Sequence, residues 1–356
     1  MPFEDEKYMR RCFDLARLGT GRVSPNPMVG AVLVYENRII GEGYHAVFGK
    51  AHAEVNAIHS VVPADRALIP RSTLYVSLEP CCVYGKTPPC SDLILEHRIP
   101  RVVVSCLDFS PLISGRGVEQ LRRGGVQVTT GVLEEEGLEL SRPAAIFLRK
   151  KRPYIILKWA ETQNGLIAPS NRQPFWISGA ASRRLTHKWR MEADAILVGT
   201  TTALHDDPSL DNRYFFGKSP VPVLLDRRGM LPPGLKVFQH PKAPVVFVQN
   251  GQPLPPYPGE VHIEAVDFER PLLLDELLQR LYLLKIGILL VEGGAAVLQS
   301  FVQQGLWDEA RVIHSTGSFL ADGLPAPSLS VPPAACTLIE GDEIRYFRNE
   351  QALNLF

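Results

Sequence analysis

Apolar and polar positions along the first half of the chain predict helices and strands in alternation. Near the N-terminus, apolar side chains recur at helical spacing and predict an amphipathic helix: Tyr8, Met9, Cys12, Phe13 and Ala16. Strand-length apolar runs and further helical segments follow, with strands at 29–35, 39–43, 73–77, 101–106 and 126–129 and helices at 52–60, 90–97 and 118–123. This alternation predicts a three-layer α/β sandwich for the first part of the chain.

A second α/β series begins after a short basic stretch, LRKKRP at 148–153. We interpret the stretch as a solvated linker rather than a nucleic-acid site, and we place the domain boundary there, between 1–148 and 153–356. Beyond it, the pattern predicts strands at 154–159, 195–199, 221–226, 245–248 and 287–291 and helices at 181–192, 273–285 and 295–304. Proline and glycine concentrate at 231–258, which predicts surface loops.

Composition and charge narrow the class of protein. The 356 residues include 38 basic and 38 acidic side chains, so no electrostatic footprint for nucleic acid or an anionic membrane is expected. No apolar run reaches the ~18–20 residues of a membrane span, and the N-terminus lacks the pattern of a secretory signal. Three of the six cysteines lie between Cys81 and Cys90, which indicates metal binding or catalysis rather than disulfides. We therefore expect a soluble cytoplasmic enzyme that acts on a small molecule.

One histidine and two cysteines have the composition of a catalytic zinc site. Such a site uses three protein ligands and keeps a fourth position for water, and His52, Cys81 and Cys90 supply one imidazole and two thiolates. Glu54, two residues after the histidine, fits the general acid/base that moves a proton to a leaving amine. The alternative is a structural zinc site closed by Cys82. Because a closed site has no use for a carboxylate beside the metal, Glu54 favours the catalytic site.

These motifs resemble those of the cytidine deaminase superfamily, whose signature is H-x-E followed by P-C-x-x-C. Here HAE is followed by LEPCC and then, after a longer gap, by TPPC. Together with SPNPMVGAV and GEGYH, the longer gap resembles the deaminase half of the bifunctional deaminase/reductases of riboflavin biosynthesis. The resemblance implies that His52, Cys81 and Cys90 are zinc ligands. It also implies that Glu54 is the acid/base and that Asn26 contacts the pyrimidine. For Asn26, an ordinary turn asparagine is an equal alternative.

A strand followed by two glycines and a helix predicts an anion-binding turn in the second half. Glu292, Gly293 and Gly294 lie between an apolar strand and the helix at 295–304. Adjacent glycines let the backbone approach an anion, and a helix N-terminus offers free N–H groups and a positive dipole end. The turn is not the G-x-G-x-x-G of Rossmann folds, and a purely geometric role for the glycines is the alternative.

Further motifs of the second half resemble the reductase half of the same family. They recur in order as PYIILKWA, WIS, HKWR, DAILVGTTT, DDPSL and VEGG. The resemblance implies a dihydrofolate-reductase-like fold with NADPH as the hydride donor. It assigns the cofactor site to Trp176, Thr202, Asp206, Gly294, Ala295 and Ala296. It assigns the phosphorylated substrate to Arg190, Leu210, Arg213 and Glu292. A planar guanidinium suits a phosphate monoester, although a plain surface role is the alternative for each arginine.

Three departures from the family pattern concern the reductase half. Asn164 lies in a TQNG turn where the family has Ser-Leu-Asp-Gly, Pro174 replaces a substrate-contacting serine, and His314 begins HSTG where a proline-containing stretch is more frequent. Because hydride transfer depends on positioning and electrostatics more than on one side chain, we expect reductase activity to persist with altered affinity. Arg227 and Arg228 follow a predicted strand and are candidates for the 2′-phosphate of the cofactor, a solvated turn being the alternative.

The resemblance therefore implies a bifunctional enzyme of riboflavin synthesis. The first half would release ammonia from a diaminopyrimidinone ribosylamino phosphate, and the second would use NADPH to reduce the ribosyl group to ribityl. Three alternatives stay open: a deaminase whose reductase half is weakened or lost, a deaminase of free nucleosides or nucleic acid, and a zinc-stabilised regulatory protein. We expect a phosphorylated pyrimidine as the only class of partner besides the cofactors, with a homo-oligomer left open.

Overall fold

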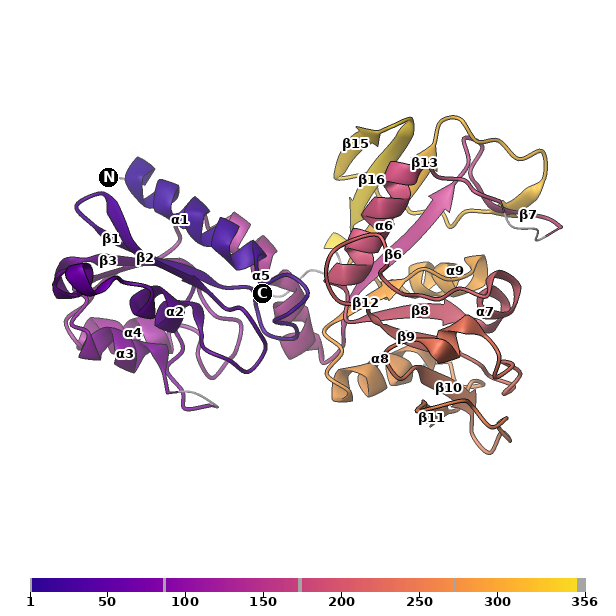
Figure 1. Cartoon of the computed structure of the whole chain (residues 1–356), viewed down its shortest axis with the longest axis horizontal. Coiled ribbons are helices and arrows are strands. Elements are labelled where there is room, and N and C mark those ends of the chain that lie inside the picture. The colour runs from indigo at the N-terminus through magenta and orange to yellow at the C-terminus, as the bar shows by residue number, and fades with distance from the viewer. Residues whose placement is uncertain (1, 86–87, 172–174, 272, 351–356) are drawn as a thin grey trace. The chain divides into compact units, whose positions relative to one another are not determined.

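The computed structural model describes residues 2–85, 88–171, 175–271 and 273–350. The chain divides into two compact units, Met1–Lys150 and Lys151–Phe356, each with its own main sheet (Figure 1). Within the described residues, no helix combines the length and the apolarity needed to cross a bilayer.

The first unit is built on a five-stranded sheet with strand order β2-β1-β3-β4-β5. β1 pairs antiparallel with β2 and β3, whereas β3, β4 and β5 are parallel. The strands are β1 (Gly30–Tyr35), β2 (Arg38–Tyr44), β3 (Thr73–Leu78), β4 (Arg101–Cys106) and β5 (Gln127–Thr129). The helices are α1 (Pro2–Arg17), α2 (Ala53–His59), α3 (Cys90–Glu96), α4 (Arg116–Arg123) and α5 (Glu134–Lys150), with a 3-10 helix, η1, at Pro63–Arg71.

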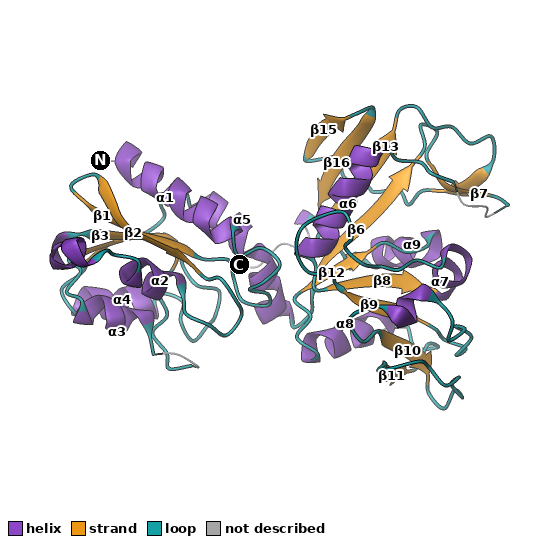
Figure 2. Cartoon of the chain, viewed as in Figure 1, coloured by secondary structure: helices purple, strands orange, loops and turns teal. Residues whose placement is uncertain are grey.

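Helices cover both faces of this sheet. α1 and α5 pack on one face, and α2, α3 and α4 pack on the other (Figure 2). Phe13 of α1 and Leu140 of α5 belong to the core of the first face. Ala57, Ile94 and Leu121, one from each of the other three helices, belong to the core of the second. The predicted three-layer sandwich is confirmed, because each helix buries its apolar stripe against the sheet.

The second unit is built on a nine-stranded sheet with strand order β11-β10-β9-β8-β12-β6-β13-β16-β15. The strands from β11 to β13 are parallel, and β16 and β15 continue the sheet in antiparallel fashion. Its strands are β6 (Tyr154–Glu161), β8 (Ala195–Gly199), β9 (Val221–Leu225), β10 (Val245–Gln249), β11 (His262–Val266), β12 (Ile288–Val291), β13 (Glu309–Ser315), β15 (Ala335–Ile339) and β16 (Asp342–Arg348). β7 (Leu166–Pro169) and β14 (Gly323–Pro325) form a separate antiparallel pair.

The helices of the second unit are α6 (Ala180–Glu192), α7 (Thr200–Asp206), α8 (Leu273–Leu283) and α9 (Ala295–Gln303), with a 3-10 helix, η2, at Lys236–Gln239. Leu277 and Leu281 of α8 and Phe301 of α9 pack in one core with Ile155 of β6 and Leu289 of β12. Ligands of parallel sheets bind beyond the carboxyl ends of the strands. The ends of β6, β8 and β12 are therefore the expected place for a site.

The interpretation of 148–153 as a solvated linker is wrong. Residues up to Lys150 form the last turn of α5. Arg152 is buried, and its guanidinium donates two hydrogen bonds, of 2.6 and 2.8 Å, to the carboxylate of Asp308. Asp308 is 0% exposed and also accepts the N–H of Ile155. A basic run predicts a solvent-exposed segment only if none of its cations pairs with a buried carboxylate. Here the carboxylate of Asp308 lies 156 residues away in the sequence, so the local pattern could not report the pair.

Candidate functional sites

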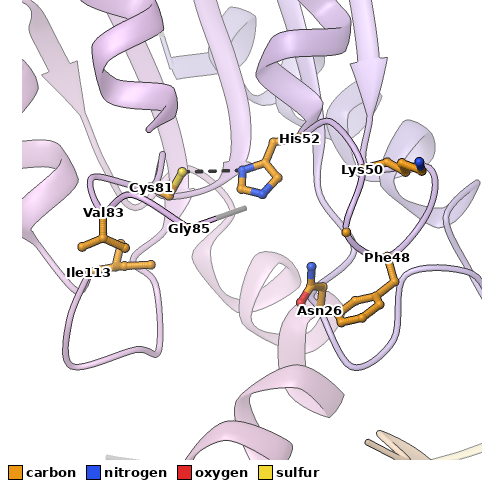
Figure 3. Close-up of a pocket in the computed structure, with 9 residues that line it drawn as sticks. Asn26, Phe48, Lys50, His52, Cys81, Val83, Gly85 and Ile113 are labelled. Atoms are coloured by element: carbon orange, nitrogen blue, oxygen red, sulfur yellow. Dashed lines mark hydrogen bonds between the residues drawn. The ribbon is translucent and has the colours of Figure 1, made fainter. Parts of the chain in front are cut away.

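Three potential metal ligands from separate segments converge in the first unit. His52 lies immediately before α2, Cys81 follows the turn after β3, and Cys90 is the first residue of α3. His52 Nδ1 lies 3.5 Å from Cys81 Sγ and 3.4 Å from Cys90 Sγ, and all three ligand atoms lie within 4.8 Å of one another. Figure 3 shows the imidazole of His52 facing Cys81. The structure thus brings together the three residues expected to be zinc ligands.

The separations between these atoms fit a single zinc ion. Ligand atoms at about 2.0–2.3 Å from zinc in tetrahedral geometry lie about 3.5 Å apart. Among the described residues, no fourth histidine, cysteine, aspartate or glutamate joins the group, so Cys82 is not part of it although it adjoins Cys81. Three protein ligands without a fourth are the arrangement of a catalytic zinc site rather than a structural one.

Local hydrogen bonds favour the thiolate of Cys81. The Cys90 thiol and the His52 imidazole interact with this sulfur, and the backbone N–H of Cys90 donates to it at 3.3 Å. Together they lower the pKa of Cys81, against the opposing effect of burial. The thiolate is the form of cysteine that binds metal, so these contacts favour the ligand form of Cys81.

Glu54 is a buried carboxyl beside the ligand group. It lies in the first turn of α2 and is 3% exposed. Burial raises the pKa of Glu54 to about 7, and the negative charge of Cys81 adds to the effect. A carboxyl that titrates near neutrality can both take and give a proton, which is the property required of a general acid/base.

Asn26 reaches the same site through a histidine. Its Nδ2 lies 3.3 Å from Nε2 of His45, and Nδ1 of His45 lies 3.0 Å from the carbonyl oxygen of Ala51. Burial lowers the pKa of His45 and so favours the neutral ring. Because a carbonyl only accepts, Nδ1 carries the hydrogen and Nε2 accepts from the Asn26 amide. The rings of His45 and His52 meet edge to face, with centroids 5.6 Å apart, so Asn26 is tied to a candidate ligand through one residue.

A cavity of about 330 Å³ opens beside the ligand group (Figure 3). Its walls combine two ligands, one amide, one lysine and three apolar side chains: His52, Cys81, Asn26, Lys50, Phe48, Val83 and Ile113. The volume lies in the range of pockets that hold small organic molecules. The site therefore has the components of a small-molecule deaminase: a metal ligand set, a buried proton carrier and a pocket.

In the second unit, β12 ends in a glycine turn that lies against β8. A Cβ on Gly293 would lie 2.5 Å from the Cα of Val198, so only glycine permits this approach. Gly294 has a φ of +73° and precedes α9 without a side-chain cap. A Cβ on Gly294 would lie 3.0 Å from Oγ1 of Thr202, so these two residues, both expected at the cofactor site, are neighbours. The turn has the form of an anion cradle at a helix N-terminus.

The residues expected at the substrate form an ion-pair cluster beside this turn. Arg190 donates two hydrogen bonds to the Glu292 carboxylate, of 2.9 and 2.8 Å, and one of 3.0 Å to the carbonyl of Asp211. Arg213 pairs with the Asp211 carboxylate at 2.6 Å. Burial alone would raise the pKa of Glu292, but the positive charges of Arg190 and Lys158 lower it to about 2. The guanidinium of Arg190 is thus engaged by the protein itself, and Arg213 is the more exposed of the two arginines.

The other expected residues are spread over neighbouring elements. Ala295 and Ala296 begin α9. Asp206 ends α7, and Leu210, which follows α7, is buried. Trp176 lies on a different cavity, also of about 330 Å³, which the ends of β13 and the start of β16 help to form. Its ring is 73% exposed and lies 4.8 Å from the guanidinium of Arg183.

The three departures from the family pattern have different surroundings. Asn164 accepts a hydrogen bond of 2.8 Å from Thr162 Oγ1 within its own turn and donates one of 2.7 Å to the carbonyl of Leu320, 156 residues away. His314 lies 2.9 Å from the carboxylate of Glu161. Pro174 lies outside the described residues.

Two polar residues at these sites were not singled out from the sequence. His45 lies within GEGYH, where a lone histidine gives no local signal. Lys158 lies in β6 near Glu292, and burial lowers its pKa. A charged side chain inside the otherwise apolar PYIILKWA strand was the signal that would have found it. Arg227, considered for the 2′-phosphate, forms an ion pair with Glu269.

Two family models match the chain, one in each unit. The model described as the cytidine and deoxycytidylate deaminase zinc-binding region matches residues 2–106, which contain the three candidate ligands and Glu54. The model described as the RibD C-terminal domain matches residues 153–317. The predicted fold, a cytidine-deaminase-like sandwich followed by a dihydrofolate-reductase-like domain, is confirmed. Zinc and NADPH are the cofactors of these two domains.

Relatives matched over most of their length join the two halves in one chain. The riboflavin biosynthesis protein RibD of Aquifex aeolicus is 38% identical over 328 residues, which cover 92% of this chain and 91% of the relative. The RibD protein of Escherichia coli is 31% identical, and the match covers 87% of both chains. Because these matches run through both halves, they do not favour the alternatives of a lone deaminase or a regulatory protein.

Solved structures agree with this result. The deaminase/reductase of Thermotoga maritima is 37% identical and superposes with a TM-score of 0.88, covering 98% of this chain and 99% of that one. A RibD structure from Acinetobacter baumannii is 29% identical and gives a TM-score of 0.86 over 98% of this chain and 99% of that one. The alternative of a lost reductase half is not favoured, because the likeness extends through both units. The chain belongs to the RibD family of bifunctional deaminase/reductases of riboflavin biosynthesis.

Proposed function

We propose that this chain catalyses two consecutive steps of riboflavin biosynthesis. The first is the hydrolytic deamination of 2,5-diamino-6-ribosylamino-4(3H)-pyrimidinone 5′-phosphate, which releases ammonia. The second is the NADPH-dependent reduction of the ribosyl group, which gives 5-amino-6-ribitylaminouracil 5′-phosphate. The observation that carries the proposal is the buried carboxyl of Glu54 beside three converging zinc ligands. The Thermotoga maritima relative, named a diaminohydroxyphosphoribosylaminopyrimidine deaminase/5-amino-6-(5-phosphoribosylamino)uracil reductase, supports the choice of substrate.

In the deaminase half, His52, Cys81 and Cys90 would hold the zinc ion, which supplies a Lewis acid that makes a water nucleophilic near neutrality. Glu54 takes a proton at its carboxylate and later gives it to the departing amine. Its pKa of about 7 suits both transfers, and its burial excludes bulk water from them. Asn26, oriented by its hydrogen bond to His45, contacts the pyrimidine in the cavity.

In the reductase half, bound NADPH supplies the hydride. The glycine turn before α9 provides backbone N–H groups for its pyrophosphate, with Thr202 beside Gly294. Arg190 keeps the Glu292 carboxylate ionised and holds its orientation, because the guanidinium donates a hydrogen bond to each carboxylate oxygen. Arg213 is the candidate for the substrate phosphate, since its guanidinium is half-exposed. The family resemblance adds the remaining contacts: Trp176, Asp206, Ala295 and Ala296 for the cofactor and Leu210 for the substrate.

We assign the deaminase activity to residues 1–148 and the reductase activity to residues 153–356. The positions of the two family matches support this division. We also infer that the enzyme works in the cytoplasm. All six cysteines are free, and ligands that must be thiolates are best kept in a reducing compartment.

One assay tests both activities. The purified protein is given the diaminopyrimidinone phosphate, first alone and then with NADPH, while ammonia and NADPH are followed together. We expect ammonia release in both conditions and NADPH oxidation only after the deaminated product has formed. Ammonia release without subsequent NADPH oxidation would contradict the reductase assignment, and a lack of ammonia release with full zinc content would contradict the deaminase assignment.

A further inference from the structure

Glu79 is a buried acid that the proposed chemistry does not use. It follows β3, precedes Cys81 by two residues and is 3% exposed. Its carboxylate accepts three backbone N–H groups, those of Asp108 at 3.1 Å, Gly115 at 2.9 Å and Val118 at 3.0 Å. All three donors lie in one segment, 108–118, so a single side chain holds both ends of it.

Two features of this segment explain why it needs an acceptor from outside. Gly115 precedes α4 with a φ of +77° and has no side chain that can cap the helix. The carboxylate of Glu79 supplies the missing cap from the segment that follows β3, and its negative charge suits a helix N-terminus. Gly117 lets the segment come close to the strand, because a Cβ there would lie 2.1 Å from the carbonyl oxygen of Pro80.

The middle of the segment forms one wall of the candidate deaminase cavity. Ile113 lines this cavity together with Cys81 and His52 (Figure 3). Between the anchored ends, the segment turns back on itself through a hydrogen bond of 2.9 Å from the N–H of Ile113 to the carbonyl of Ser110. The described wall of the cavity contains Ile113 and not Glu79, so Glu79 reaches a bound molecule only through the backbone that it holds.

We propose that Glu79 is a positioning residue of the deaminase. It fixes the 108–118 segment to the turn that carries Cys81, and it thereby sets the width of the slot between Ile113 and the zinc ligands. The inference rests on the proposed deaminase activity. If the wall is already fixed, binding of a pyrimidine ring does not carry the entropic cost of ordering it. Glu79 therefore contributes to substrate binding more than to the proton transfers.

Glu79→Gln tests this role because the amide nitrogen cannot accept a hydrogen bond. We expect the KM for the pyrimidine phosphate to rise about tenfold, as for the loss of a charge-assisted hydrogen bond. The kcat for ammonia release should change less than about threefold, and the zinc content should not change. Glu119→Gln is the matched control, since Glu119 is an exposed acid of α4. An unchanged KM in Glu79→Gln would overturn the proposal.

A second variant separates positioning from general stability. Ile113→Ala removes the side chain that Glu79 is proposed to place, so the double variant should have about the same KM as Ile113→Ala alone. Additive effects of the two substitutions on KM would overturn the proposal. If Glu79→Gln loses zinc, Glu79→Asp keeps the charge with a shorter reach and is used in the same cycle. Loss of zinc from both variants would also overturn it, because Glu79 would then hold the metal ligands rather than the wall.

Hydrogen exchange distinguishes failure of this inference from failure of the proposed function. Exchange of the backbone amides in 108–118 requires no activity, and it should be faster in Glu79→Gln than in the wild type or in Glu119→Gln. If the wild-type protein released no ammonia, the proposed function would be contradicted. The exchange rates would still show whether Glu79 anchors the 108–118 segment. Unchanged exchange in Glu79→Gln would contradict the anchor in an active enzyme.

Discussion

The carboxylate of Glu292 accepts hydrogen bonds from two nitrogens of Arg190, at 2.9 and 2.8 Å, across 102 residues of sequence. Burial opposes ionisation of Glu292, but the positive charges of Arg190 and Lys158 lower its pKa from 4.5 to about 2. Because the folded-state pKa is depressed, the unfolded chain binds more protons here between those values. The stability that the pair contributes is therefore complete above about pH 4.5 and is lost as the pH falls toward 2.

Glu292→Gln should accordingly be less stable than the wild type at neutral pH, and the difference in the free energy of unfolding should shrink between pH 4.5 and 2. Urea unfolding followed by tryptophan fluorescence measures this, since all four tryptophans lie in the second unit. A difference that stays constant over this range would show that Glu292 does not titrate as described.

Arg152→Ala should destabilise the second unit strongly. Removing one partner of a buried ion pair leaves the carboxylate of Asp308 uncompensated, which costs about 3–5 kcal/mol. Urea unfolding at neutral pH, again read from tryptophan fluorescence, measures the change. Lys151→Ala is the control, because Lys151 is the exposed neighbour and should change the free energy of unfolding by less than about 0.5 kcal/mol.

Glu54→Gln should remove the proton carrier while leaving the zinc ligands in place. We expect kcat for ammonia release to fall by about 100- to 10,000-fold, the usual contribution of a general acid/base. The zinc content of Glu54→Gln, measured by atomic absorption, should equal that of the wild type. The control is Glu96→Gln at an exposed position of α3, whose zinc content should also equal that of the wild type. Full ammonia release by Glu54→Gln would refute the acid/base assignment.

Removal of zinc should abolish one activity and spare the other. After chelation, ammonia release should stop and return on addition of zinc, whereas NADPH oxidation with the deaminated product supplied should continue. Cys90→Ser should lower the zinc content, and Cys82→Ser should keep it, because Cys82 is not in the ligand group. Loss of zinc from Cys82→Ser would point to a four-ligand structural site instead.

Gly294→Ala should weaken NADPH binding about tenfold, as expected when a contact of about 1.4 kcal/mol is lost. The added methyl group would lie 3.0 Å from Thr202 Oγ1 within the proposed cradle. Gly251→Ala is a matched control, since Gly251 has a similar φ of +75° and open space around it. Both variants carry the backbone strain, so isothermal titration with NADPH isolates the effect of the cradle. Equal affinities in the two variants would argue against this location.

The candidate deaminase site was readable from sequence because its chemistry is local. His52 and Glu54 are two residues apart, and Cys81 and Cys90 lie at a strand end and a helix start that the pattern predicts. The support around them was not readable. Glu79 accepts backbone N–H groups that lie 29 to 39 residues further along the chain, and His45 contacts the Ala51 carbonyl and the Asn26 amide. No residue pattern reports which N–H, carbonyl or amide a buried side chain will meet.

The helices and strands of the two units were also predicted only in part. β12 and β6 have continuous apolar runs and were expected, because strands buried on both faces are apolar throughout. β15 has an almost wholly exposed sequence, ACTLI, and was missed because it pairs only at the sheet edge. α5 was missed although it spans 17 residues, since Pro143 within it indicates a helix break. Buried Leu140, Ala145 and Ile146 hold that helix on the sheet regardless.

Only three residues join the last residue of α5, Lys150, to the first residue of β6, Tyr154. Two of the three, Arg152 and Pro153, are already buried. Anyone who separates the halves for independent expression therefore has a single exposed position at which to divide the gene. A truncated chain that starts at Pro153, where the family match begins, would lack the counter-ion of Asp308, and its poor yield could be mistaken for an inability of the reductase half to fold alone.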